Sequence, residues 1–158
     1  SKAAFADVAI LGPVSALGER TPLMVSGKGA QAVARLLSPL GVDVEIADGE
    51  PGAAMAHKLL RSVLMKGLAS VVVEAVTAGR AAGLEEWIRA QIANQLAGDG
   101  QAVIDRFLTG TAKHAVRRSK EMRDTAGYLG DLGVPAEMTT ASAAALGRIA
   151  QESAPALR

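Results

Sequence analysis

The sequence predicts a mainly helical protein organised around one long helix, with a partial α/β segment before it. From Ala53 onward, about thirty residues contain no proline and are dominated by Ala, Leu, Met, Lys, Arg and Glu, which favour helices. Short runs with β-branched residues, by contrast, occur before residue 50. The long helix is expected to run to about Gly83 and to span roughly 40 Å at ~1.5 Å per residue.

The first fifty residues predict a fragment of an α/β layer. Residues 5–11 and 23–26 are expected to be strands joined by a turn-rich loop. Residues 30–40 have apolar side chains at helical spacing, although Pro39 would end that helix early, and residues 42–47 alternate as in a half-exposed strand. Three strands and one helix cannot cover both faces of a sheet, so this layer is expected to be incomplete.

The remaining chain predicts helices separated by short breaks. Residues 85–96 begin with two acids and stop before the glycines at 98 and 100, and residues 101–108 form a short amphipathic stretch that Gly110 would end. Thr111 is a suitable N-cap for a helix over 112–129, and Gly133 with Pro135 separates that helix from one over 136–150. No strand-like alternation occurs after residue 50.

The long helix is apolar on most of its sides, which predicts a central position with neighbours around it. One row of residues at helical spacing is expected to be buried, and its members are Leu60, Leu64, Gly67, Leu68, Val71 and Ala75. Trp87, at the start of the following helix, is expected to be a packing anchor.

Composition narrows the classes of function. Of the 158 residues, 49% are hydrophobic but only 3% aromatic, which favours closely packed helices of small side chains. The formal charge of +1 offers no global attraction to nucleic acid or to an anionic membrane surface. The apolar runs are broken by charges, so no membrane span is expected. Cysteine is absent, which is compatible with a cytoplasmic location and excludes thiolate chemistry.

Lys58 is the first candidate for chemistry. It lies near the start of the long helix, at the positive end of the helix dipole, and Arg61 follows one turn later. Partial burial and a neighbouring cation would both favour the neutral amine, which can exchange a proton with a substrate hydroxyl or carbonyl. The alternative interpretation is a lysine whose stem packs on the protein while its ammonium group reaches solvent or a carboxylate.

The segment Gly52 to Lys58, GAAMAHK, resembles the GxGxxxK segment that opens the interdomain helix of β-hydroxyacid dehydrogenases. This group includes the 3-hydroxyisobutyrate and 6-phosphogluconate dehydrogenases, and the branch most similar to this chain carries a C-terminal domain of unknown function. The resemblance implies that Lys58 is the catalytic acid/base. Ser62 stands where the family usually carries asparagine, and with Arg61 it is a candidate substrate-binding residue.

The same resemblance implies the domain organisation. Residues 1–50 would be the C-terminal remnant of a nucleotide-binding (Rossmann) domain, and residues 51–158 an all-helical 6-phosphogluconate-dehydrogenase-like domain for substrate binding and dimerisation. It implies a cytoplasmic homodimer and an NAD(P)-dependent oxidoreductase that acts on a small β-hydroxy acid. No GxGxxG turn follows a strand, and the GKGAQA segment at 27–32 is expected to be a loop and helix start. We therefore expect a fragment that is inactive alone, whose NAD or NADP is bound mainly by a preceding half.

The basic segment over 113–123 is the second candidate. It is expected to be either a solvated helix face with i,i+4 ion pairs or a substrate site in which Arg117 or Arg118 holds a carboxylate or phosphate. Nucleic-acid binding is disfavoured because stacking aromatics are absent and acids interrupt the run. Its SKEM sequence resembles the family's KDL segment, which implies that Lys120 approaches the cofactor.

The third candidate is the loop after the first strand. By resemblance, Leu11, Gly12 and Pro13 occupy the family's substrate loop, where Gly12 would offer its backbone amide. His57 and His114 lack neighbouring acids, so no metal site is predicted. Two other functions remain open: a non-enzymatic helical dimerisation module, and an imine-reductase-like enzyme on the same scaffold that dispenses with the lysine.

Overall fold

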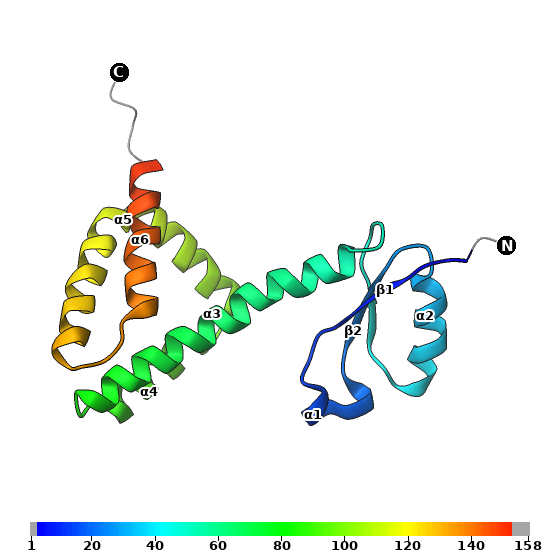
Figure 1. Cartoon of the computed structure of the whole chain (residues 1–158), viewed down its shortest axis with the longest axis horizontal. Coiled ribbons are helices and arrows are strands. Elements are labelled where there is room, and N and C mark those ends of the chain that lie inside the picture. Colours follow the sequence, from blue (N-terminus) through cyan, green and yellow to red (C-terminus); the bar gives the residue numbers. More distant parts are fainter. Residues whose placement is uncertain (1–2, 153–158) are drawn as a thin grey trace, which may run out of the picture. The chain divides into compact units, whose positions relative to one another are not determined.

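A computed structural model describes residues 3–152, and these residues divide into two compact units between Gly67 and Leu68. The division falls inside the long helix α3 (Ala53–Ala81), so α3 contributes its first half to one unit and its second half to the other. Figure 1 labels the elements. The expected long helix and its bounds are confirmed. The functional boundary at residues 50 and 51 stays a prediction.

The first unit contains a three-stranded sheet in the order β1-β2-β3. Strand β1 (Asp7–Ile10) pairs antiparallel with β2 (Leu23–Ser26), and β2 pairs parallel with β3 (Val44–Ile46). The short helix α1 (Val14–Leu17) and a 3-10 turn (Gly18–Arg20) occupy the connection between β1 and β2. Helix α2 (Ala30–Leu37) and a second 3-10 turn (Ser38–Leu40) connect β2 to β3. The predicted strand, strand, helix, strand order is confirmed.

The core of this unit is small because small side chains form it. Ala9, Met24, Ala47 and Ala54 are buried together, so the first turn of α3 packs directly on the sheet. Alanines allow the backbone of α3 to approach the strands closely. This contact fixes the beginning of α3, and therefore the segment that carries Lys58, against the strands.

The second unit continues α3 through α4 (Glu85–Leu96), α5 (Gly100–Asp131) and α6 (Glu137–Glu152). The second half of α5 runs beside α6 (Figure 1), and the two helices bury Ala115, Ser119 and Leu129 from α5 with Thr139 and Ala143 from α6. At the turn into α4, hydrogen bonds from Arg80 and then Arg89 lower the pKa of Glu85 to about 2. The helical fold of this part was predicted correctly.

The predicted break at Gly110 and Thr111 is wrong. Helix α5 continues through both residues, and the irregularity lies at His114, whose φ of −123° and ψ of 18° are not helical. Helices tolerate an internal glycine at a cost of about 1 kcal/mol. The expected division between two helical segments is thus present as a kink, at His114 instead of Gly110 and Thr111.

The predicted burial of the long helix is also wrong for the single chain. Leu60 and Leu64, both assigned to the buried row, are 72% and 64% exposed, and Val63 is 74% exposed. Val71 is 47% exposed and Leu68 is 37% exposed. The apolar side chains of this part of α3 are therefore largely exposed in the single chain. Trp87 is likewise 58% exposed.

Two glycines of α3 provide a matched test of packing. A Cβ at Gly79 would lie 2.5 Å from Ile88 Cγ2, whereas a Cβ at Gly67 meets nothing within 4 Å. Gly79→Ala is therefore expected to destabilise the protein by about 1–3 kcal/mol through overpacking between α3 and α4. Gly67→Ala is expected to raise the stability of the monomer by up to about 1 kcal/mol, since alanine favours the helix and the position has open space in the single chain. Urea unfolding of both variants checks this, and equal effects would contradict the close approach at Gly79.

Candidate functional site

Side chains distant in sequence hold the N-terminus of α3. Asp7 Oδ2 accepts hydrogen bonds from the backbone N–H groups of Gly52 (3.0 Å) and Met55 (3.1 Å), and the buried Ser26 Oγ accepts from Ala54 N–H (3.0 Å). These are the groups that a helix start leaves unsatisfied, and a carboxylate there also complements the helix dipole. Neither Asp7 nor Ser26 was predicted to cap this helix. The available signal was the absence of a local Ser, Thr, Asp or Asn before Ala53.

Lys58 lies one turn beyond this capped start. It is half-buried on α3, while Arg61 is exposed and Ser62 is half-buried. The Ser62 hydroxyl is contacted by Lys66 Nζ at 3.4 Å, the outer limit of a hydrogen bond, and His57 Nδ1 lies 2.8 Å from the Ala53 carbonyl oxygen. The caps at residues 52, 54 and 55 fix the backbone from which the Lys58 side chain extends.

Gly12 lies in the same unit as Lys58, in the connection after β1. It is half-buried, and a Cβ there would lie 3.1 Å from Leu17 Cδ1 and 3.4 Å from Thr21 Cγ2. The residues at the start of this loop are held to β2, because Leu11 N–H donates to the Pro22 carbonyl at 2.9 Å. The loop is therefore an ordered part of the sheet unit, and its role in substrate binding stays a prediction.

The described residues do not form a cradle for the pyrophosphate of a dinucleotide. Gly27 and Gly29 are covered by the chain itself, because Cβ atoms there would lie 2.8 Å from Pro51 Cγ and 3.0 Å from the Phe5 carbonyl carbon. Gly29 N–H is also used, donating to the Phe5 carbonyl oxygen at 2.8 Å. The glycines serve close packing in this unit, in agreement with their interpretation as a loop and helix start.

The predicted basic residues lie on α5, in the second unit. Arg117 pairs with Glu121 on the exposed face, while the half-buried Arg118 donates through Nη1 to Thr111 Oγ1 at 2.8 Å. Lys120 is exposed. The structure thus divides the candidate residues into one group near the start of α3, with Gly12, Lys58, Arg61 and Ser62, and one on α5, with Arg117, Arg118 and Lys120.

Glu74 of α3 forms hydrogen bonds with the start of α6, a role that was not predicted from the sequence. Its carboxylate accepts from the backbone N–H of Met138 (2.7 Å) and Thr139 (2.8 Å) and from Thr139 Oγ1 (2.6 Å), so α3 caps the start of α6. Burial favours the neutral acid, but the hydrogen bonds from Thr139 and Met138 outweigh it and lower the pKa of Glu74 below its usual 4.5.

Replacing Glu74 by glutamine should therefore destabilise the protein by about 1–2 kcal/mol at neutral pH, because charge-assisted hydrogen bonds become neutral ones. A lowered pKa stabilises the fold above the usual carboxyl value, and this contribution is lost as the pH falls through the folded-state pKa of Glu74. The difference between wild type and Glu74→Gln in urea unfolding should thus shrink on acidification below about pH 4.5. Glu137→Gln, at an exposed carboxylate in the first turn of α6, is the control. A pH-independent difference for Glu74→Gln would contradict this account.

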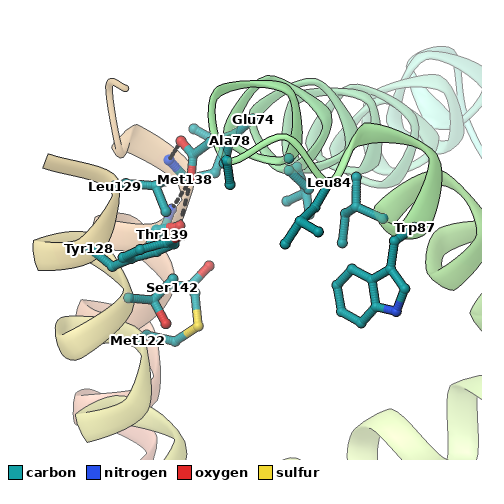
Figure 2. Close-up of a pocket in the computed structure, with 16 residues that line it drawn as sticks. Glu74, Ala78, Leu84, Trp87, Met122, Tyr128, Leu129, Met138, Thr139 and Ser142 are labelled. Carbon is teal, nitrogen blue, oxygen red and sulfur yellow. Dashed lines mark hydrogen bonds between the residues drawn. The ribbon is translucent and has the colours of Figure 1, made fainter. Parts of the chain in front are cut away.

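A cavity of about 400 Å³ opens beside Glu74 in the helical unit. Figure 2 shows Leu84 and Trp87 on one side, with Met122, Tyr128 and Ser142 on the opposite side. The lining is mostly apolar, and the carboxylate of Glu74 is already occupied by α6. The cavity therefore favours an apolar occupant over a charged one.

The geometry defines a class of protein: a helical unit entered by one long helix from an α/β segment. Residues 80–149 match the family described as "Domain of unknown function (DUF1932)", which covers most of the cavity lining. Residues 80–149 thus match a DUF1932 domain, which agrees with the expected resemblance to a branch that carries a C-terminal domain of unknown function. A search of curated proteins gives no significant match.

Solved structures are similar over nearly the whole chain. A conserved protein of unknown function, described as structurally similar to 3-hydroxyacid dehydrogenases, is 28% identical with a TM-score of 0.54, over 96% of this chain and 59% of its own. An imine reductase from Streptomyces aurantiacus is 18% identical with a TM-score of 0.65, over 94% and 56% of the two chains. A conserved hypothetical protein from Sinorhizobium meliloti 1021 is 30% identical with a TM-score of 0.47, over 90% and 48%.

The chain therefore spans between 48% and 59% of the length of these structures. The similarity to the imine reductase concerns the fold alone. The fold of this chain is thus similar to that of a protein described as resembling 3-hydroxyacid dehydrogenases and to that of an imine reductase. Among the described helices, none has the length and apolar character that crossing a membrane requires.

Proposed function

We propose that this chain is part of an NAD(P)-dependent oxidoreductase in which Lys58 transfers the proton. The observation that carries the proposal is the half-buried Lys58 one turn beyond a helix start that Asp7 and Ser26 fix to the sheet. In the oxidation of a small β-hydroxy acid, the neutral amine of Lys58 would take the hydroxyl proton, and in the reverse direction its ammonium would return a proton to the carbonyl oxygen. Arg61, Ser62 and the Gly12 loop would position the substrate.

The nucleotide, NAD or NADP, would accept or supply the hydride and would be held mainly by residues outside this chain, because Gly27 and Gly29 are covered by the chain itself. Lys120 would approach it from α5. On this proposal the 158 residues alone are inactive. The cysteine-free sequence agrees with a reducing cytoplasm as the place of action.

The experiment that tests the substrate class follows NADH and NADPH oxidation and formation by the full-length gene product. A panel of small β-hydroxy acids and their keto acids is assayed beside cyclic imines. Turnover of hydroxy or keto acids supports the proposal. Turnover of imines alone would favour the imine-reductase-like alternative, and a pure protein inert towards both would favour a non-enzymatic dimerisation module.

We further propose that the protein is a homodimer in which a second copy covers the apolar part of α3. The leucines and valines between Leu59 and Val73 are exposed in the single chain, and contiguous apolar surface of this kind often marks a protein interface. The same chain offers the apolar cavity beside Trp87 and Tyr128. In a two-fold symmetric dimer, the apolar part of α3 in each copy would pack on the apolar cavity of the other copy.

A further inference from the structure

Arg118 is unusual among the arginines of this protein. Within residues 3–152 it is the arginine whose side chain is half-buried, whereas all the others are exposed. None of the ion pairs formed by these described residues includes it. Its neighbour Arg117, by contrast, pairs with Glu121 in full solvent. Partial burial of a guanidinium removes part of its hydration, and without a neighbouring carboxylate no ion pair offsets this desolvation free energy.

The guanidinium of Arg118 is also held in one orientation. Its Nη1 donates to Thr111 Oγ1, two turns earlier in α5 and on the other side of the kink at His114. It lies over Gly110, where a Cβ would be 2.9 Å from Nη2 and 3.7 Å from Cζ. Glycine at this position therefore leaves the space that the planar group occupies. Such fixation lowers the entropy lost when the remaining N–H donors bind a ligand.

We propose that Arg118, oriented by Thr111 and Gly110, binds the anionic oxygen group of a ligand, either a carboxylate or a phosphate. The planar fork of donors matches two oxygens of such a group, and the partly desolvated setting strengthens the attraction. This inference goes beyond the proposed function and is independent of the role of Lys58, because it concerns an anion site on α5 within the helical unit. It excludes Arg117, which Glu121 already neutralises.

The test is anion binding by the chain of residues 1–158, which needs no turnover and stands even if Lys58 is not catalytic. Inorganic phosphate and sodium acetate are titrated separately against the ¹⁵N-labelled protein at constant ionic strength, with sodium chloride as the reference for screening. Saturable shifts of the α5 amides with phosphate, with acetate or with both are expected. The anion that binds more tightly identifies which oxygen group the site prefers.

Arg118→Gln is expected to weaken this binding by about tenfold or more, since a charge-assisted pair is lost. Arg118→Lys keeps the charge but not the fork and should also weaken it. Gly110→Ala should weaken it without any change of charge, by displacing the guanidinium. Arg117→Gln is the matched control and should alter binding less than about twofold.

Circular dichroism confirms that each variant remains folded before its titration is interpreted. Equal losses in Arg117→Gln and Arg118→Gln would overturn the proposal, because binding would then follow net charge. Absence of saturable binding by the folded wild-type chain would overturn it as well, and would leave Arg118 as a clamp across the kink. In either case the assignment of Lys58 is decided separately by turnover.

Discussion

Replacing Lys58 by methionine in the full-length protein is expected to lower kcat by about 10²–10⁴-fold, the usual contribution of general acid–base catalysis. Methionine keeps the length and apolar stem of lysine but cannot carry a proton. The caps of α3 by Asp7 and Ser26 do not involve the Lys58 side chain, so folding and dimerisation should be unchanged. Steady-state kinetics with the preferred substrate, beside circular dichroism and size-exclusion chromatography, measures both parts of this expectation.

Lys113→Met is the matched control, because Lys113 is an exposed helical lysine on α5 to which no role in the proposed reaction or in the dimer is assigned. It should retain nearly wild-type turnover. If Lys58→Met is as active as the control, the proton-transfer role is wrong. A variant that loses turnover of hydroxy acids but retains reduction of imines would instead identify the imine-reductase-like chemistry that does not need the lysine.

The elements that the sequence predicted well are those whose signals are local. The long helix, α4 and the order of the three strands follow from runs of helix formers, first-turn acids and the glycines and prolines between elements. The error at Gly110 arose because a glycine followed by a threonine has the local pattern of a helix end. In the fold, Gly110 instead provides the space for Arg118, and the kink occurs at His114.

The contacts that position the candidate site could not be predicted from local sequence patterns. Asp7 caps a helix 45 and 48 residues away, Ser26 one 28 residues away, and Glu74 caps a helix 64 and 65 residues away. No periodicity links residues so distant, since their proximity depends on how sheet and helices pack. The sequence pattern did identify Lys58 as a candidate, but the groups that fix its helix emerged only from the fold.

The predicted burial of the long helix was wrong for a different physical reason. Periodicity indicates that a helix face is apolar, but it does not say which molecule covers that face. Leu60 and Leu64 satisfy the pattern of a buried row and are nevertheless exposed in the single chain. If a second copy covers them, the prediction of a central helix wrapped by neighbours applies to the dimer. The oligomeric state therefore decides how this pattern is to be interpreted.

Replacing Leu64 by glutamate is accordingly expected to convert the dimer into a monomer. Burying a leucine stabilises an interface by about 1.5–3 kcal/mol, and in a symmetric dimer each substitution is present twice. The loss of about 3–6 kcal/mol corresponds to a dissociation constant raised by about 10²–10⁴-fold, before the cost of burying two carboxylates is added. Sedimentation equilibrium over a range of protein concentrations measures this change directly.

Leu36→Glu provides the matched control, because Leu36 is an exposed leucine on α2, outside the apolar part of α3. It should leave the dissociation constant nearly unchanged, which would show that the effect at Leu64 is specific to α3 and not a general consequence of added charge.

A wild-type chain that sediments as a monomer would contradict the proposed dimer, and the exposed row on α3 would then need a different partner. A dimer equally weakened by both substitutions would place the interface elsewhere. If the Leu64→Glu variant keeps the dissociation constant of the wild type, the face of α3 that carries Leu64 is not the dimer interface. Two unpaired carboxylates in an apolar two-fold interface would cause a large loss of affinity.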